Sequence, residues 1–179
     1  NGLTIKALAT TGAGETLSIN TDTDTQGLYD KIKDFLTQYN EIINEITSLY
    51  NADSAKGYEP LTDDEKESMS ESEIEKWETK IKDAILRKDS TLGTIQSTMT
   101  NAMMQTYTIN GQTYSLASFG IQTLGYLNAS KNENYAYHID GDSEDSVTAG
   151  KTDKLMSALT NDPDTVIDFM KQLTSGLYS

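Results

Sequence analysis

The chain has no cysteine, a single histidine and no long uninterrupted apolar run among its 179 residues. Without cysteine, disulfide bonds, thiolate metal sites and a cysteine nucleophile are excluded together. The apolar stretches are broken by Lys, Asp, Asn and Thr, and none approaches the roughly 18 apolar residues that indicate a transmembrane helix. We therefore expect no membrane insertion and a fold that is stable without covalent cross-links.

Positive charge is also scarce, because 14 basic residues face 28 acidic ones and the net charge is −14. Most non-specific affinity for nucleic acids comes from basic side chains that bind the phosphates. An excess of acidic side chains opposes this binding, so we expect no nucleic-acid partner. The excess is concentrated in residues 53–75, with nine acidic and two basic side chains, and in residues 133–145, with five acidic and none basic. Such segments are typical of solvated faces or loops.

The sequence offers little that could carry catalysis. A serine triad or a histidine proton shuttle would need His138, and no Gly-x-Ser-x-Gly turn is present to expose a nucleophile. The acidic loop at residues 140–145 could gather a hard cation, but it lacks the glycine expected at its sixth position, which favours a solvated loop. We predict no enzyme, and no catalytic, cofactor-binding or metal-binding residues.

The clearest positive feature is a heptad pattern that predicts one helix over residues 25–50. At 1.5 Å per residue this helix is about 37 Å long, so it must lie along a partner. The pattern favours the core stripe of a helical bundle, and an intermolecular coiled coil remains the alternative. Its apolar positions alternate in steps of four and three: Leu28, Ile32, Phe35, Tyr39, Ile42, Ile46 and Leu49.

Capping patterns predict where the helices begin. Thr23 with Gln26, Thr62 with Glu65 and Ser70 with Glu73 each have the spacing of a capping box. After Ser70, apolar residues at helical spacing favour Trp77 as a buried anchor. A further helix is expected from Leu92 to about Gln105, a short one over residues 154–159, and another after Asp162-Pro163.

The remaining segments indicate strands. Residues 1–22 alternate as a hairpin, and residues 107–109 and 112–114 flank Asn110-Gly111, a strong signal for a tight turn. Residues 116–124 could continue this small sheet, and residues 135–139 could add a strand. The predicted fold class is α+β, an antiparallel helical bundle or coiled-coil domain over residues 23–179 with a small β insertion around 107–140.

Several motifs resemble the bacterial flagellar hook-associated protein 2 family, which caps the flagellar filament. The stretch from Tyr58-Glu59-Pro60-Leu61-Thr62 through Trp77 to Lys88-Asp89-Ser90 carries the resemblance. Supporting motifs are Asp30-Lys31-Ile32-Lys33-Asp34-Phe35, Ser115-Leu116-Ala117-Ser118-Phe119-Gly120-Ile121 and Asp162-Pro163-Asp164-Thr165-Val166. Residues 124–150 depart from the shorter segment expected there. Since the chain begins without methionine, we expect it to be an internal piece of a longer protein.

The resemblance implies a secreted structural protein at the flagellum tip, which helps flagellin assemble and prevents its loss. It implies flagellin as a partner, a homo-oligomer for the full-length protein, and an indirect relation to hook-filament junction proteins. This piece alone is expected to be a monomer. Residues 1–22 would be the last hairpin of a β-rich head domain, and residues 23–179 a helical leg. An extracellular coiled-coil adhesin or stalk is the alternative. The expected structural anchors are Leu28, Ile32, Phe35, Tyr39, Ile42, Ile46, Leu49, Tyr58, Pro60, Leu61, Ile74, Trp77, Ile81 and Leu92.

Overall fold

The computed structural model describes residues 12, 14 and 23–178, so the hairpin predicted for residues 1–22 lies outside the described residues. The described part is helix-rich and contains two small antiparallel sheets, β1 with β2 and β3 with β4. This confirms the α+β class. No described helix is both long and apolar enough to cross a membrane. The elements are α1 (Thr25–Tyr50), α2 (Asp63–Glu67), α3 (Glu71–Asp83), α4 (Ser90–Met103), β1 (Tyr107–Ile109), β2 (Gln112–Tyr114), the 3-10 helix η1 (Leu116–Phe119), β3 (Ile121–Thr123), β4 (Tyr137–Ile139), α5 (Lys154–Asn161) and α6 (Pro163–Tyr178).

Helix α1 has the predicted bounds but a different cap. The Asp24 carboxylate accepts a hydrogen bond from the Gly27 N–H at 2.9 Å. The Gln26 side chain donates to Asp30, whereas the predicted capping box needs it to accept from the Thr23 N–H. The predicted capping box of Thr23 with Gln26 is therefore wrong by one position. The physical reason is that Asp24 is the N-cap residue, and its carboxylate satisfies the free Gly27 N–H group.

The buried face of α1 also differs from the predicted heptad row. Of the seven predicted positions only Ile32 and Tyr39 are buried, and Ile42 is 51% exposed. Because α4, α5 and β4 all contact α1, the helix needs an apolar face wider than one heptad row. The row that faces the centre is Tyr29, Ile32, Leu36, Tyr39, Ile43 and Thr47.

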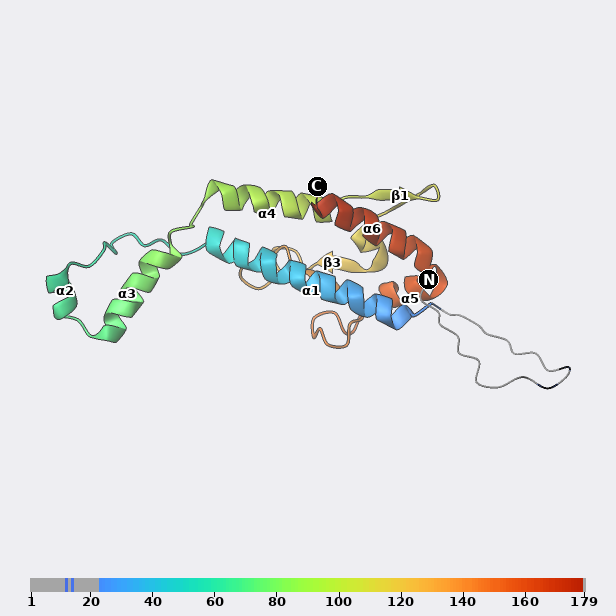
Figure 1. Ribbon diagram of the computed structural model, residues 1–179, viewed down its shortest axis with the longest axis horizontal. Helices are drawn as coiled ribbons and strands as arrows, with labels where there is room; N and C mark the ends of the chain where they lie inside the picture. Colours follow the sequence, from blue (N-terminus) through green and yellow to red (C-terminus); the bar gives the residue numbers. More distant parts are fainter. Residues whose placement is uncertain (1–11, 13, 15–22, 179) are drawn as a thin grey trace.

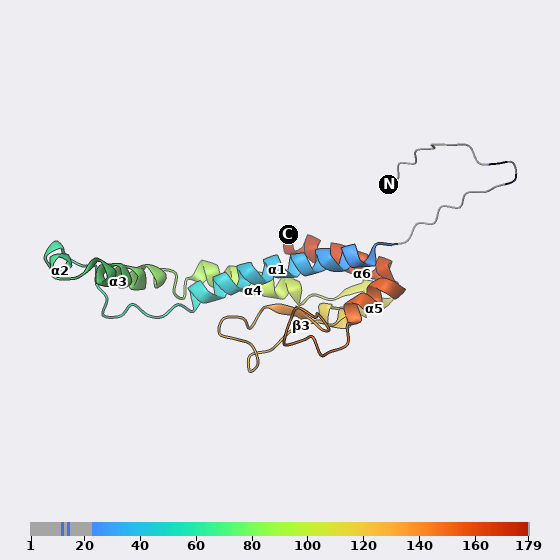
Figure 2. The same cartoon turned by 90° about the horizontal axis from the view of Figure 1, so that it is seen from below.

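The core lies where α1, α4, α5 and α6 meet the short strands. Helices α4 and α6 lie alongside α1 (Figure 1), and the β3–β4 sheet with its loops covers one face of these helices (Figure 2). Phe169 of α6 is fully buried, with its ring centroid 5.7 Å from that of Tyr107 and 5.1 Å from that of Phe119. The other fully buried apolar side chains are Ile43, Met103, Ile121, Leu155, Leu159, Val166 and Leu173.

The strands follow the sequence only in part. The β1–β2 hairpin turns at Asn110 and Gly111, with φ of 51° and 80°, as predicted. Residues 116–119 do not continue this sheet, because they form η1, which buries Leu116 and Phe119 on one side. Gly120, with φ of 72°, then turns the chain into β3, which pairs with β4 in a separate sheet. The expectation of one continuous sheet is therefore wrong.

Residues 51–89, which we call the arm, extend beyond the ends of α1 and α4 (Figure 1). Both predicted capping boxes, at Thr62 and Ser70, are present. Neither α2 nor α3 contains a buried residue, so Trp77 is partly exposed rather than the buried anchor expected. Its ring packs on Tyr58 at 4.6 Å between centroids, and its Nε1 donates to the Glu59 carbonyl at 2.8 Å. Local contacts therefore order the arm.

Candidate functional site

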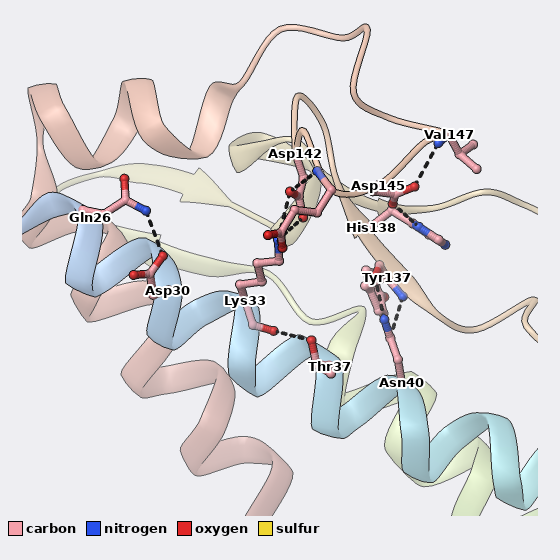
Figure 3. Close-up of polar contacts among 11 residues, drawn as sticks. Gln26, Asp30, Lys33, Thr37, Asn40, Tyr137, His138, Asp142, Asp145 and Val147 are labelled. Atoms are coloured by element: carbon pink, nitrogen blue, oxygen red, sulfur yellow. Dashed lines mark hydrogen bonds and ion pairs between the residues drawn. The ribbon is translucent and has the colours of Figure 1, made fainter.

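The residues that the sequence singled out for chemistry lie together, where β4 and the following loop pack against the first half of α1 (Figure 3). They are His138 and the acidic residues of the loop at 140–145. The sequence predicts a solvated loop, but Asp140 and Asp142 are only 6% and 9% exposed. That prediction is wrong for these two carboxylates, because Asp142 forms an ion pair with Lys33 of α1 and Asp140 forms one with Lys151.

Lys33 of α1 joins the loop to the helix. Its Nζ lies 2.7 Å from Asp142 Oδ2 and 2.6 Å from Glu144 Oε2. Hydrogen bonds to Asp142 and then to Glu144 raise the pKa of Lys33 well above its usual value. The Lys33 carbonyl also accepts from the Thr37 hydroxyl at 3.0 Å (Figure 3). The ammonium group therefore remains charged and offsets the burial of Asp142.

About two turns beyond Lys33 along α1, the Asn40 side chain takes the place of a neighbouring strand beside β4. Its side-chain amide donates to the Tyr137 carbonyl and its Oδ1 accepts from the Tyr137 N–H, both at 2.8 Å. Tyr137 pairs with Thr123 on the other side. Because an unpaired strand edge leaves backbone groups without partners, this double contact closes the outer edge of β4.

Asp140 is held by two side chains and a glycine turn. Gln122 Nε2 donates to it at 2.9 Å and Lys151 Nζ at 2.8 Å. Gly141 follows with φ of 85°, and a Cβ there would lie 2.6 Å from the Asp153 backbone nitrogen. Only glycine fits this position without strain, since both the backbone angle and the close approach exclude a side chain.

His138 contacts Asp145 rather than solvent. Its Nδ1 lies 2.6 Å from Asp145 Oδ2, and Asp145 Oδ1 accepts from the Val147 N–H at 2.9 Å. Partial burial acts to raise the pKa of Asp145, but the hydrogen bonds from His138 and Val147 outweigh it and the pKa lies below its usual value. His138 Nε2 is buried and has no hydrogen-bond partner within the described residues.

These contacts bring α1, β4 and the acidic loop together as one unit. Within residues 12, 14 and 23–178, no group of three or more His, Asp and Glu side chains is placed to hold a metal ion. Each acidic side chain discussed here is engaged by a cation, an amide or a backbone N–H. The arrangement therefore positions a loop on a helix. Sequence reasoning missed Lys33 and Asn40, since their partners lie 109 and 97 residues away and leave no local pattern.

The comparison with protein families matches residues 1–178 to the family described as flagellar hook-associated protein 2 C-terminus. A flagellar hook-associated protein 2 from Halalkalibacterium halodurans is 32% identical over 165 residues, which is 92% of this chain and 28% of that protein. No solved structure matches the chain. Because the family match extends over nearly every residue, the chain belongs to the flagellar hook-associated protein 2 C-terminal family.

Proposed function

We propose that this chain is part of the structural cap at the tip of a bacterial flagellar filament. There it assists the assembly of flagellin and prevents its loss into the medium. The observation that carries this proposal is the family match over residues 1–178. This chain corresponds to only 28% of the length of that relative, so the activity of a whole cap protein is part of the proposal.

In this proposal residues 23–179 form a stiff helical leg and residues 1–22 belong to a β-rich head. The contacts of α1 support a stiff leg, because packing and polar contacts hold this helix on several sides. Its apolar face is buried, while Lys33 and Asn40 secure the acidic loop and β4. A leg of this kind would hold neighbouring subunits apart while flagellin passes. The anchors expected in the arm, including Tyr58, Pro60, Leu61, Ile74 and Ile81, would hold its shape.

The family relationship also favours a secreted, non-enzymatic protein over an extracellular adhesin or stalk. The site geometry is consistent with this role, since His138 Nε2, the atom that a proton shuttle would use, is buried. Contacts with flagellin would be weak and largely polar, as in transient interfaces with small buried areas. We propose that the whole protein works as a homo-oligomer and meets the hook-filament junction proteins only indirectly.

The experiment is complementation of a motile bacterium that lacks its own cap protein. The full-length parent of this chain should restore long filaments and lower the amount of flagellin in the culture medium. A parent in which residues 23–178 are deleted serves as the control and should leave flagellin in the medium. If the intact parent is secreted but flagellin still accumulates outside the cell, the cap function is wrong and the adhesin or stalk alternative gains.

A further inference from the structure

The arm is ordered from within and receives little support from the core. Lys66 Nζ lies 2.6 Å from Glu78 Oε1 and joins α2 to α3, in addition to the contact of Trp77 with Tyr58 and Glu59. Within the described chain, none of α1, α4, α5 and α6 packs extensively against α2 or α3. The arm therefore holds its own shape, and its direction depends on the two connections that join it to α1 and α4 (Figure 1).

Lys88, in the connection to α4, has an uncommon backbone angle. Its φ is 58°, and the other described residues with positive φ are glycines, Asn110 and Asn132. Asn visits this left-handed region readily because its short polar side chain forms local hydrogen bonds, whereas the longer Lys side chain meets a steric penalty there. Residues in such conformations persist only where surrounding contacts hold them, and they are frequent in segments that switch.

The contacts that hold Lys88 all lead to the end of α1. Its backbone N–H donates to the Tyr50 carbonyl at 3.0 Å, and its Nζ donates to Asn51 Oδ1 at 2.9 Å. The same Nζ lies 4.3 Å from the centroid of the Tyr50 ring, which is a cation–π contact. The Tyr50 ring in turn lies against α4, because a Cβ at Gly93 would be 3.1 Å from Tyr50 Cε2. Lys88 therefore ties the arm to a point where α1 and α4 meet.

A cleft beside this junction gives the arm room to move. It has a volume of about 350 Å³ and lies between the end of α1, the arm and the segment that joins β3 to β4. Asp53 and Asp83 line it from the arm, and Lys131 lines it from the segment between the strands. Opposite charges on the two sides favour closure of the cleft, so a swing of the arm in this direction meets attraction.

We propose that Lys88 is a latch that fixes the direction of the arm, and that the arm swings as one unit about residues 51–53 and 87–89 when this latch opens. Hinges of this kind use a few residues at the ends of elements to absorb the change in backbone angles. Opening relieves the steric penalty at Lys88, which offsets part of the loss of its contacts. The latch acts within a single chain, so it does not depend on the cap function.

The experiment measures the distance between spin labels on α1 and α3 by pulsed electron paramagnetic resonance. The labels are attached to Glu45→Cys and Glu75→Cys, two exposed positions, and the chain has no cysteine of its own. The distance distribution should be narrow with Lys88 in place. Lys88→Met keeps an unbranched side chain but removes the charge and the donors, so the distribution should become several times broader and extend to shorter distances.

Two further variants sharpen this measurement. Lys88→Arg keeps a cation that can lie over the Tyr50 ring and donate to Asn51, so the distribution should stay narrow. Lys82→Met is the matched control, because Lys82 is an exposed lysine in the last turn of α3 and its loss removes the same charge from the arm. This control should leave the distribution unchanged.

Trp77 provides a check on the fold of the arm itself. It is the single tryptophan and packs on Tyr58, so its emission spectrum reports the internal structure of the arm. The spectrum should be the same in Lys88→Met and in the unsubstituted chain. Equal distance distributions in Lys88→Met and Lys82→Met would overturn the proposal. A broad distribution together with a changed emission spectrum would also overturn it, because Lys88 would then hold the fold of the arm and not its direction.

Discussion

The arm and the rest of the described chain reach order in different ways. Around α1 the helices bury a shared core, with Phe169 and Leu173 fully inaccessible. In the arm α2 and α3 contain no fully buried residue, and order comes from two capping boxes and the contact of Trp77 with Tyr58 and Glu59. Similar helical patterns in one sequence can therefore rest on tertiary burial in one region and on local bonds in the other.

The largest expected effect tests the buried side of this comparison. Phe169→Ala removes a ring that packs against Tyr107 and Phe119, and it should lower the free energy of unfolding by about 3–5 kcal/mol. Urea unfolding followed by circular dichroism measures this loss. The matched control is Tyr178→Phe, at a residue that is 94% exposed, which should leave the free energy unchanged. A loss no larger than the control's would show that α6 does not complete the core.

The next effect concerns the turn that holds the acidic loop. Gly141→Ala must place a side chain at φ of 85° and against the Asp153 backbone, so it should cost at least about 1–2 kcal/mol. Gly57→Ala in the arm is the control, since its φ of 89° is similar but its Cβ would meet nothing. Both can be measured by urea unfolding. Equal losses would mean that backbone angle alone, and not the contact with Asp153, sets the cost.

Lys33→Met should destabilise the chain by about 1–2 kcal/mol, because it leaves Asp142 without its cation in a partly exposed setting. The pKa of Lys33 is raised in the folded state, so its contribution is fully present below the unfolded value of 10.5 and is lost as pH rises through the folded pKa. Raising the pH into this range should therefore lower the free energy of unfolding of the unsubstituted chain more than that of Lys33→Met. Identical pH profiles would show that the ion pair contributes nothing.

The smallest effect belongs to the arm. Ser70→Ala removes the cap of α3 and should lower the local stability of the arm by about 0.5–1 kcal/mol without changing the core. The single tryptophan, Trp77, lies in the arm, so its fluorescence reports the arm while circular dichroism mainly reports the remaining helices. Fluorescence should change at lower urea in the variant. A shift of both signals together would mean that the arm and the core unfold as one unit.

Much of the local structure could be predicted from the sequence. The bounds of α1, the capping boxes at Thr62 and Ser70, and the Asn110-Gly111 turn all depend on residues a few positions apart. The candidate site could not be predicted to the same extent. Asp142 was expected in a solvated loop because its partner, Lys33, is distant in the chain, and nothing around either residue indicates the other.

The sequence by itself determined the bounds of α1, the starts of α2 and α3, the turn that joins β1 to β2, and the family that the motifs resemble. Those features depend on backbone angles and hydrogen bonds that neighbouring residues satisfy among themselves. Only the tertiary structure decided which row of α1 faces the core and that β3 pairs with β4. It also decided that Asp140 and Asp142 are buried. These outcomes depend on groups brought together from distant parts of the chain, so the partner and not the local pattern sets them.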